Sequence, residues 1–172
     1  MLKFILLNII FLLFTPLYAY NQESLYRDNT ASYVNKITKS IVKQFLNSNN
    51  ASKIQNGTIL IVPMVDIHDL KTMLPITKRI DENVMYEMSD NAFHVIDISA
   101  MKIMGTKEIV SEYLYISTFT NYKYEMVINA RIVNKQTKVI CASAQVVVPR
   151  KVLKDVEKLY NKDMWFSDVR NK

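Results

Sequence analysis

The chain has 172 residues, of which 49% are hydrophobic and 22% charged, the composition of one globular domain with a single core. It carries 22 basic and 16 acidic residues, for a formal charge of +6 at pH 7, but the basic residues are scattered at helical spacings. Such spacing favours solvated helix faces over a nucleic-acid surface. Only Gly57 and Gly105 are glycines, so a glycine-rich phosphate loop and the familiar nucleotide-binding enzymes are excluded.

Residues 1–19 have the layout of a secretory signal peptide. A basic start at Lys3 precedes an apolar run, and Ala19 is a small residue at the expected cut. The run is too short for a comfortable transmembrane helix, which needs roughly 20 residues. We expect cleavage after Ala19 and a location in the periplasm or outer membrane. An uncleaved signal anchor is the alternative, because Leu17 fits the third position before the cut poorly.

The single cysteine, Cys141, excludes an intramolecular disulfide. No cysteine ends the signal region, so we expect an exported protein without a lipid anchor, whose stability depends on its core. Cys141 lies between Ile140 and Ala142 in a strand-like run, which is typical of a buried, inert thiol.

The domain organisation follows from the pattern of the mature chain. Residues 20–31 form a polar lead-in, 32–149 an α/β domain, and 150–172 a C-terminal helix and tail. The first helix begins after Asn29 or Thr30, either of which can cap it. Its apolar stripe repeats every three or four residues: Tyr33, Val34, Ile37, Ile41, Val42, Phe45 and Leu46. Residues 47–57 predict a loop.

A strand, a helix and a second strand follow. The apolar run 58–64 predicts a strand covered on both faces, with Pro63 at its end or on an edge because proline has no amide hydrogen. Residues 65–73 predict a loop and 74–90 a helix with Pro75 in its first turn. Asn91 is expected in the left-handed conformation after that helix. Residues 93–98 predict a strand, whereas 99–110 are ambiguous.

The clearest β region is 112–148, where short polar turns separate three strand-like runs. These runs, 112–120, 124–133 and 138–148, predict an antiparallel meander. Its expected core face consists of Ile128, Ala130, Ile132, Ile140, Ala142, Ala144, Val146 and Val148. The opposite face is half-polar, suited to partial cover by a terminal segment or a partner subunit. The predicted fold class is therefore α+β, a two-layer arrangement in which two to three amphipathic helices pack on a mixed sheet.

Asp66, His68 and Asp69 form the one cluster with metal-ligand residue types. A zinc or hydrolytic site needs a third strong ligand and supporting hydrogen bonds, so a polar loop is the expected reading. Asp81 and Glu82 are adjacent on a helix and point in different directions. The sequence therefore predicts no catalytic, cofactor-binding or metal residues, and no cofactor.

Residues 127–149, VINARIVNKQTKVICASAQVVVP, resemble a hairpin of the FlgO family of flagellar outer-membrane-associated proteins. The resemblance extends over residues 32–149 through the first helix, TILIVPMVDI and LPITKRIDENVMYEMSDNAFHVIDI. The matching hairpin positions are Asn129, Ala130, Arg131, Val133, Thr137, Val139, Ala142, Ser143, Ala144, Val146 and Pro149. Three features depart from the family: Lys138 stands where it usually has glycine, Asn91-Ala92 replaces a glycine, and its lipid-attachment cysteine is absent.

The resemblance implies a small α/β domain related to TolB-type N-terminal domains. It also implies a non-enzymatic exported envelope protein that supports flagellar assembly or stability and motility. Its partners would be flagellar or other envelope proteins, or further copies of the chain, with outer-membrane association not requiring a lipid anchor. Exposed edges of the meander could pair with a neighbour. The alternatives are a periplasmic regulatory or ligand-binding module of another envelope machine, and a small hydrolase or metal protein built on Asp66, His68 and Asp69.

Overall fold

The computed structural model describes residues 31–99 and 110–155. The expected signal peptide, the lead-in up to residue 30, most of the ambiguous 99–110 segment and residues 156–172 lie outside the described part. The elements are a helix over residues 31–46, α2 (Ala51–Gln55), β1 (Thr58–Ile61), β2 (Val65–Asp66), α3 (Pro75–Asp90), β3 (His94–Asp97), β4 (Tyr113–Asn121), β5 (Glu125–Asn134) and β6 (Ile140–Pro149). Residues 150–155 are helical, as expected for the beginning of the C-terminal helix.

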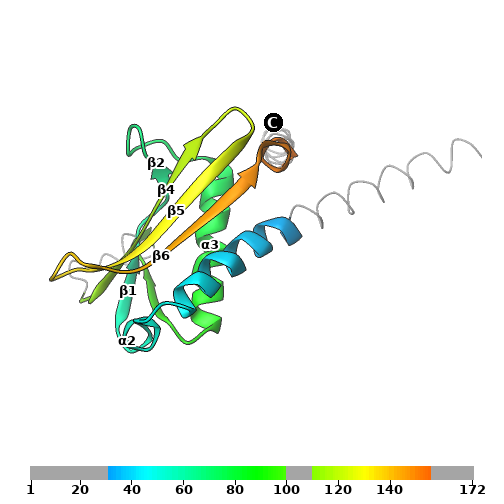
Figure 1. Cartoon of the computed structure of the whole chain (residues 1–172). Coiled ribbons are helices and arrows are strands. Elements are labelled where there is room, and N and C mark those ends of the chain that lie inside the picture. Colours follow the sequence, from blue (N-terminus) through cyan, green and yellow to red (C-terminus); the bar gives the residue numbers. More distant parts are fainter. Residues whose placement is uncertain (1–30, 100–109, 156–172) are drawn as a thin grey trace, which may run out of the picture.

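The strands form one mixed sheet in the order β3-β1-β4-β5-β6 (Figure 1). β1 runs parallel to β3 and β4, whereas β4, β5 and β6 pair antiparallel. The short β2 lies off this path and pairs with β4 beyond the end of β1. The predicted mixed α+β fold with a C-terminal three-stranded meander is confirmed.

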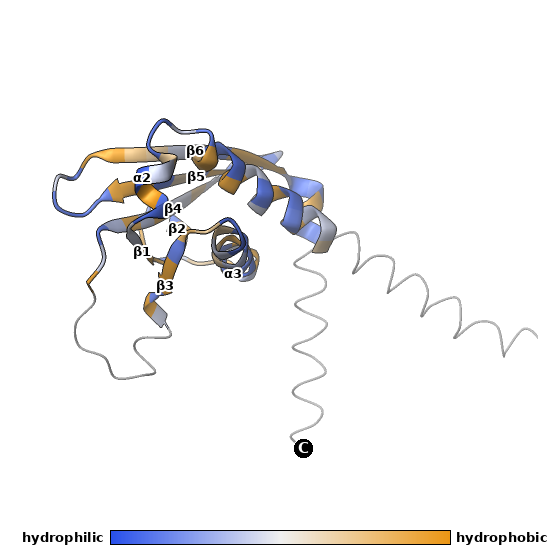
Figure 2. Cartoon of the chain, turned by 90° about the horizontal axis from the view of Figure 1, so that it is seen from below, coloured by the Kyte–Doolittle hydropathy of each residue, from blue (hydrophilic) through white to orange (hydrophobic). Residues whose placement is uncertain are grey.

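The 31–46 helix and α3 pack on the same face of the sheet and enclose the core between two layers. On the 31–46 helix the predicted stripe faces the core, with Tyr33 and Leu46 at its ends only partly buried, and the polar and apolar stripes of the helix are visible in Figure 2. Phe45 meets the ring of Tyr115 on β4 edge to face, with ring centroids 6.1 Å apart. From α3, the predicted stripe of Ile76, Ile80, Val84 and Met88 is fully buried in the same core.

Two short elements were not expected from the sequence. The predicted 47–57 loop contains α2, because Ile54 is fully buried and anchors one helical turn. The predicted 65–73 loop begins with β2, whose Val65 and Asp66 pair with Thr118 and Phe119. Both elements depend on long-range packing that no local period reveals. As predicted, Pro63 lies just after a strand, at the interruption between β1 and β2.

A bulge corrects one residue of the predicted core face. Ile132 pairs with Ala142 but Val133 pairs with Ile140, so Cys141 is an extra residue in β6. The alternation of side chains reverses at such a bulge. Ile140 is therefore 52% exposed instead of buried, and Cys141 is half-buried rather than enclosed. The rest of the face faces the core as predicted, with Val146 only partly buried.

The opposite side of the meander, termed the outer face, carries half-buried and exposed side chains. It consists of Leu114, Ile116, Thr118, Thr120, Val127, Asn129, Arg131, Val133, Ser143, Gln145 and Val147. At its centre the side-chain Nε2 of Gln145 donates to Asn129 Oδ1 at 2.8 Å. Arg131 lies between its register partners Ile116 and Ser143. The face is half-polar, as the sequence predicts.

The free edge of β6 is occupied by side chains of this same chain. Gln44 Nε2 donates to the carbonyl of Gln145 at 3.1 Å, and Gln44 Oε1 accepts from the Gln145 amide at 3.1 Å. Asn50 Nδ2 donates to the Cys141 carbonyl at 3.0 Å. The expectation of an open edge on the meander is therefore wrong for the middle of β6, because Gln44 offers the two groups that a neighbouring strand would offer.

Replacing Gln44 by alanine should remove both hydrogen bonds and lower the free energy of unfolding by about 1–2 kcal/mol. The measurement is urea denaturation, with sedimentation velocity to detect new self-association through the opened edge. Lys43→Ala, exposed on the same helix, is the matched control. Equal stability of the Gln44 and Lys43 variants would show that the edge contact contributes nothing.

Two positions that depart from the family pattern have left-handed backbone. Ala92, rather than the predicted Asn91, has a positive φ of 62°, and Lys138 also has a φ of 62°. Asn91 itself has a φ of −97°. A side chain with a Cβ atom is disfavoured in this region, whereas glycine is not. Ala92 and Lys138 are therefore strained, at two positions where the resemblance led us to expect glycine.

Ala92→Gly and Lys138→Gly should each raise the free energy of unfolding by about 0.5–1 kcal/mol, because relief of strain outweighs the added freedom of the unfolded chain. Thermal and urea unfolding check this. Ser89→Gly, on the exposed side of α3, should have the opposite effect. Destabilisation by all three substitutions would contradict the strain argument.

Candidate functional site

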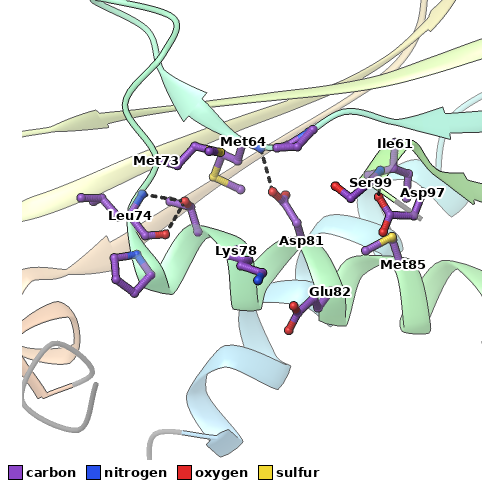
Figure 3. Close-up of a pocket in the computed structure, with 13 residues that line it drawn as sticks. Ile61, Met64, Met73, Leu74, Lys78, Asp81, Glu82, Met85, Asp97 and Ser99 are labelled. Atoms are coloured by element: carbon purple, nitrogen blue, oxygen red, sulfur yellow. Dashed lines mark hydrogen bonds between the residues drawn. The ribbon is translucent and has the colours of Figure 1, made fainter. Parts of the chain in front are cut away.

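A pocket of about 640 Å³ opens where β1 and β3 end, beside the first half of α3 (Figure 3). Ile61 and Asp97 are register partners at the carboxyl ends of these parallel strands, and both line the pocket. Ligands of α/β sheets commonly bind at this end of parallel strands. The walls are mainly apolar: Ile61, Pro63, Met64, Met73, Leu74, Pro75 and Met85. Its size and lining are those of a binding site.

Asp81 is the buried acid of this pocket, with only 6% of its surface exposed. It points from α3 toward the break between β1 and β2 (Figure 3). Its Oδ2 accepts the backbone N–H of Met64 at 2.7 Å, and its Oδ1 accepts the Ser117 hydroxyl at 3.4 Å. The helix is thereby tied both to the strand break and to β4.

Burial raises the pKa of Asp81 from 3.8 to about 7. The hydrogen bonds from Met64 and Ser117 oppose this shift, while the nearby carboxylates of Asp97 and Glu82 add to it. Glu82, one residue along the helix, is exposed, so the two adjacent acids do point in different directions.

Tyr115, which is two residues from Ser117 on β4, carries a further polar group buried in this core. Its ring is fully buried, and its hydroxyl has no hydrogen-bond partner within the described residues. Burial raises the pKa of Tyr115 above its usual range, the Asp81 charge raises it further, and the neighbouring Ser117 side chain opposes the shift without meeting the geometry of a hydrogen bond. The hydroxyl therefore stays protonated at neutral pH.

Asp66 instead ends β2 and is half-buried, and His68 and Asp69 follow it in an exposed loop. Asp66 Oδ1 accepts the backbone N–H of His68, and Asp69 accepts the N–H groups of Lys71 and Thr72. The Thr72 hydroxyl, then these two N–H groups, hold the pKa of Asp69 down at about 2. The acids cap a turn, and His68 does not join them in a shared site.

No group of three or more histidine, cysteine, aspartate or glutamate side chains within residues 31–99 and 110–155 could hold a metal ion. Every helix in these same ranges is too short or too polar to cross a membrane.

The sequence prediction missed Asp81 as a pocket residue. A signal was present, because Asp81 lies four residues after Thr77 and three before Val84, on the buried side of α3. A carboxylate within an apolar helical stripe marks either a functional group or a group bound by the backbone. Here the carboxylate is bound by the Met64 backbone and also faces a pocket.

Asp81 should make stability fall as pH rises. The acid binds a proton more tightly in the folded protein than in the unfolded chain, so its burial costs nothing at low pH. The cost grows above the unfolded pKa of 3.8 and levels off once the pH exceeds the folded pKa of about 7, amounting to roughly 4 kcal/mol at most.

Asp81→Asn should therefore be more stable than the wild type at pH 8, and the difference should vanish near pH 4. Urea unfolding between these values measures it, with Asp90→Asn, at the exposed end of α3, as the control. If the difference in the free energy of unfolding between the wild type and Asp81→Asn does not change with pH, the raised pKa of Asp81 is contradicted.

The fold and pocket together define a mixed α+β domain with a half-polar outer sheet face and an apolar pocket that contains a buried acid. Over residues 103–153 the chain matches the model of a family described as FlgO protein, which confirms the resemblance predicted from the hairpin. The match includes all of β4, β5 and β6 but less than half of the chain. No curated protein sequence matches this chain.

Several solved structures are similar in fold. The LpoB C-terminal domain from Escherichia coli is 11% identical, with a TM-score of 0.45 over 64% of this chain and 96% of that one. The LpoB C-terminal domain from Salmonella enterica is 12% identical, with a TM-score of 0.42 over 63% of this chain and 92% of that one. Lipoprotein GNA1162 from Neisseria meningitidis is 15% identical, with a TM-score of 0.36 over 54% of this chain and 79% of that chain. No residue role is transferred from them.

Proposed function

We propose that this chain is a non-enzymatic exported envelope protein that supports flagellar assembly or stability. The observation that carries the proposal is the match of residues 103–153 to the FlgO protein family, which spans the whole meander. The signal-peptide layout of residues 1–19 supports export. We propose cleavage after Ala19 and a place of action in the periplasm or at the outer membrane.

The described structure suits a protein that acts by docking. The outer face of the meander is half-polar, with Arg131 and Asn129 among apolar neighbours, a mixture found at interfaces that form between folded subunits. The middle of the β6 edge is already bonded to Gln44 and Asn50. Contacts with flagellar or envelope proteins, or with further copies of the chain, would therefore use surfaces other than the middle of the β6 edge, such as the outer face.

Deleting the gene should reduce swimming and alter the flagella seen by electron microscopy. The full chain supplied in trans should restore motility, whereas a version lacking residues 2–19 should not, because it would stay in the cytoplasm. Normal flagella and full motility in the deletion strain would contradict the flagellar role.

A second candidate is a periplasmic regulatory or ligand-binding module, which the pocket around Asp81 favours. Purification from envelope extracts separates the two candidates. Recovery of a cell-wall enzyme or transporter, without any flagellar protein, would favour the module. Flagellar neighbours of the gene and flagellar proteins in the purified complex would favour the first candidate.

A further inference from the structure

The charge of the pocket is opposite to that of the chain. Three carboxylates line it, from Asp81, Glu82 and Asp97, against the one amine of Lys78. The whole chain has a formal charge of +6. An apolar cavity with an acidic wall is complementary to a cation on an apolar stem.

Among the residues that the structure describes, no basic side chain neutralises Asp81. The groups that shift its pKa are hydrogen-bond donors and other carboxylates, and no hydrogen bond joins Lys78 to Asp81 in Figure 3. Buried carboxylates in proteins are normally paired with a cation or held neutral by a proton. A guanidinium or ammonium group that enters the pocket would replace the proton and supply the missing charge partner.

The surface next to the pocket extends beyond the reach of a small molecule. Met73 lines the pocket and is 59% exposed, and Ile67 and Leu70, in the same loop, are 47% and 64% exposed. The Asp66 amide bonds the Thr72 carbonyl at 2.9 Å and closes this 67–73 loop. Apolar side chains gathered on one loop mark a contact surface for a protein.

We propose that the pocket receives an arginine or lysine side chain of a partner protein, with its cationic group against the Asp81 carboxylate and its apolar neighbours against the 67–73 loop. This inference rests on the proposed function, since it gives the docking protein a specific contact. The aliphatic stem of the inserted side chain packs on Met64, Met85 and Ile61.

Methionine methyl groups report on the site directly. Met64, Met73 and Met85 line the pocket, whereas Met126 is fully buried in the sheet and absent from its lining. NMR of methyl-labelled methionine follows titrations with n-butylguanidinium and with its neutral isostere n-butylurea, at about pH 8, where Asp81 is largely ionised. Butylguanidinium should shift the three pocket methyls saturably and leave Met126 unchanged, and butylurea should bind at least about tenfold more weakly.

Peptides separate a protein partner from a small cation. Acetyl-Leu-Leu-Arg-Leu-Leu-amide should bind more tightly than butylguanidinium, because its leucines contact the loop, and its citrulline analogue should bind at least about tenfold more weakly. Asp81→Asn should weaken both cationic probes by a similar factor, whereas Asp69→Asn, in the loop but outside the pocket lining, should not. Met73→Ser should weaken the peptide more than butylguanidinium.

Three results would overturn the proposal: no saturable shift with either cation, equal binding by a folded Asp81→Asn protein, or butylguanidinium binding with the peptide excluded. Normal chemical shifts of Met126 show that each variant is folded. Motility separates this inference from the proposed function. A swimming defect in the deletion strain without cation binding would overturn only the pocket assignment, and cation binding with unimpaired flagella would overturn only the flagellar role.

Discussion

The hydrogen bond from the Met64 amide to the Asp81 carboxylate is the contact on which the rest of the arrangement depends. On the side away from β5, β4 pairs with β1 along its first half and with β2 along its second half. Pro63 interrupts the ladder between them because it has no amide hydrogen. The next amide, that of Met64, therefore turns to α3, and Asp81 is held where the parallel strands end. The pocket forms at this gap in the sheet.

The elements that follow a local period could be predicted from the sequence, and those that depend on distant partners could not. The stripe Ile76, Ile80, Val84 and Met88 shows the buried face of α3 without any structure. Ile140 shows the opposite case, since its exposure results from a bulge at Cys141 that depends on the pairing of β6 with β5. α2 and β2 are likewise stabilised by packing and pairing across the fold.

In the candidate site, too, local sequence patterns and tertiary contacts give different answers. Asp66, His68 and Asp69 attract attention in the sequence because they are close together, yet each acid is satisfied by amides of its own loop. Asp81 attracts little attention because its neighbour Glu82 is also acidic and no histidine is nearby. Its significance comes from burial and from the end of β1, which are tertiary properties. The family resemblance, by contrast, is carried by the hairpin sequence itself and agrees with the matched region.

The contact between Gln44 and Gln145 has a consequence for how this protein can assemble. A side-chain amide that matches a peptide unit ends the sheet from within the molecule, at the position where another chain would extend it. Growth by strand addition, which leads to open-ended fibres, is blocked there. Any assembly of this chain should therefore join folded subunits through contacts other than strand addition at the middle of β6.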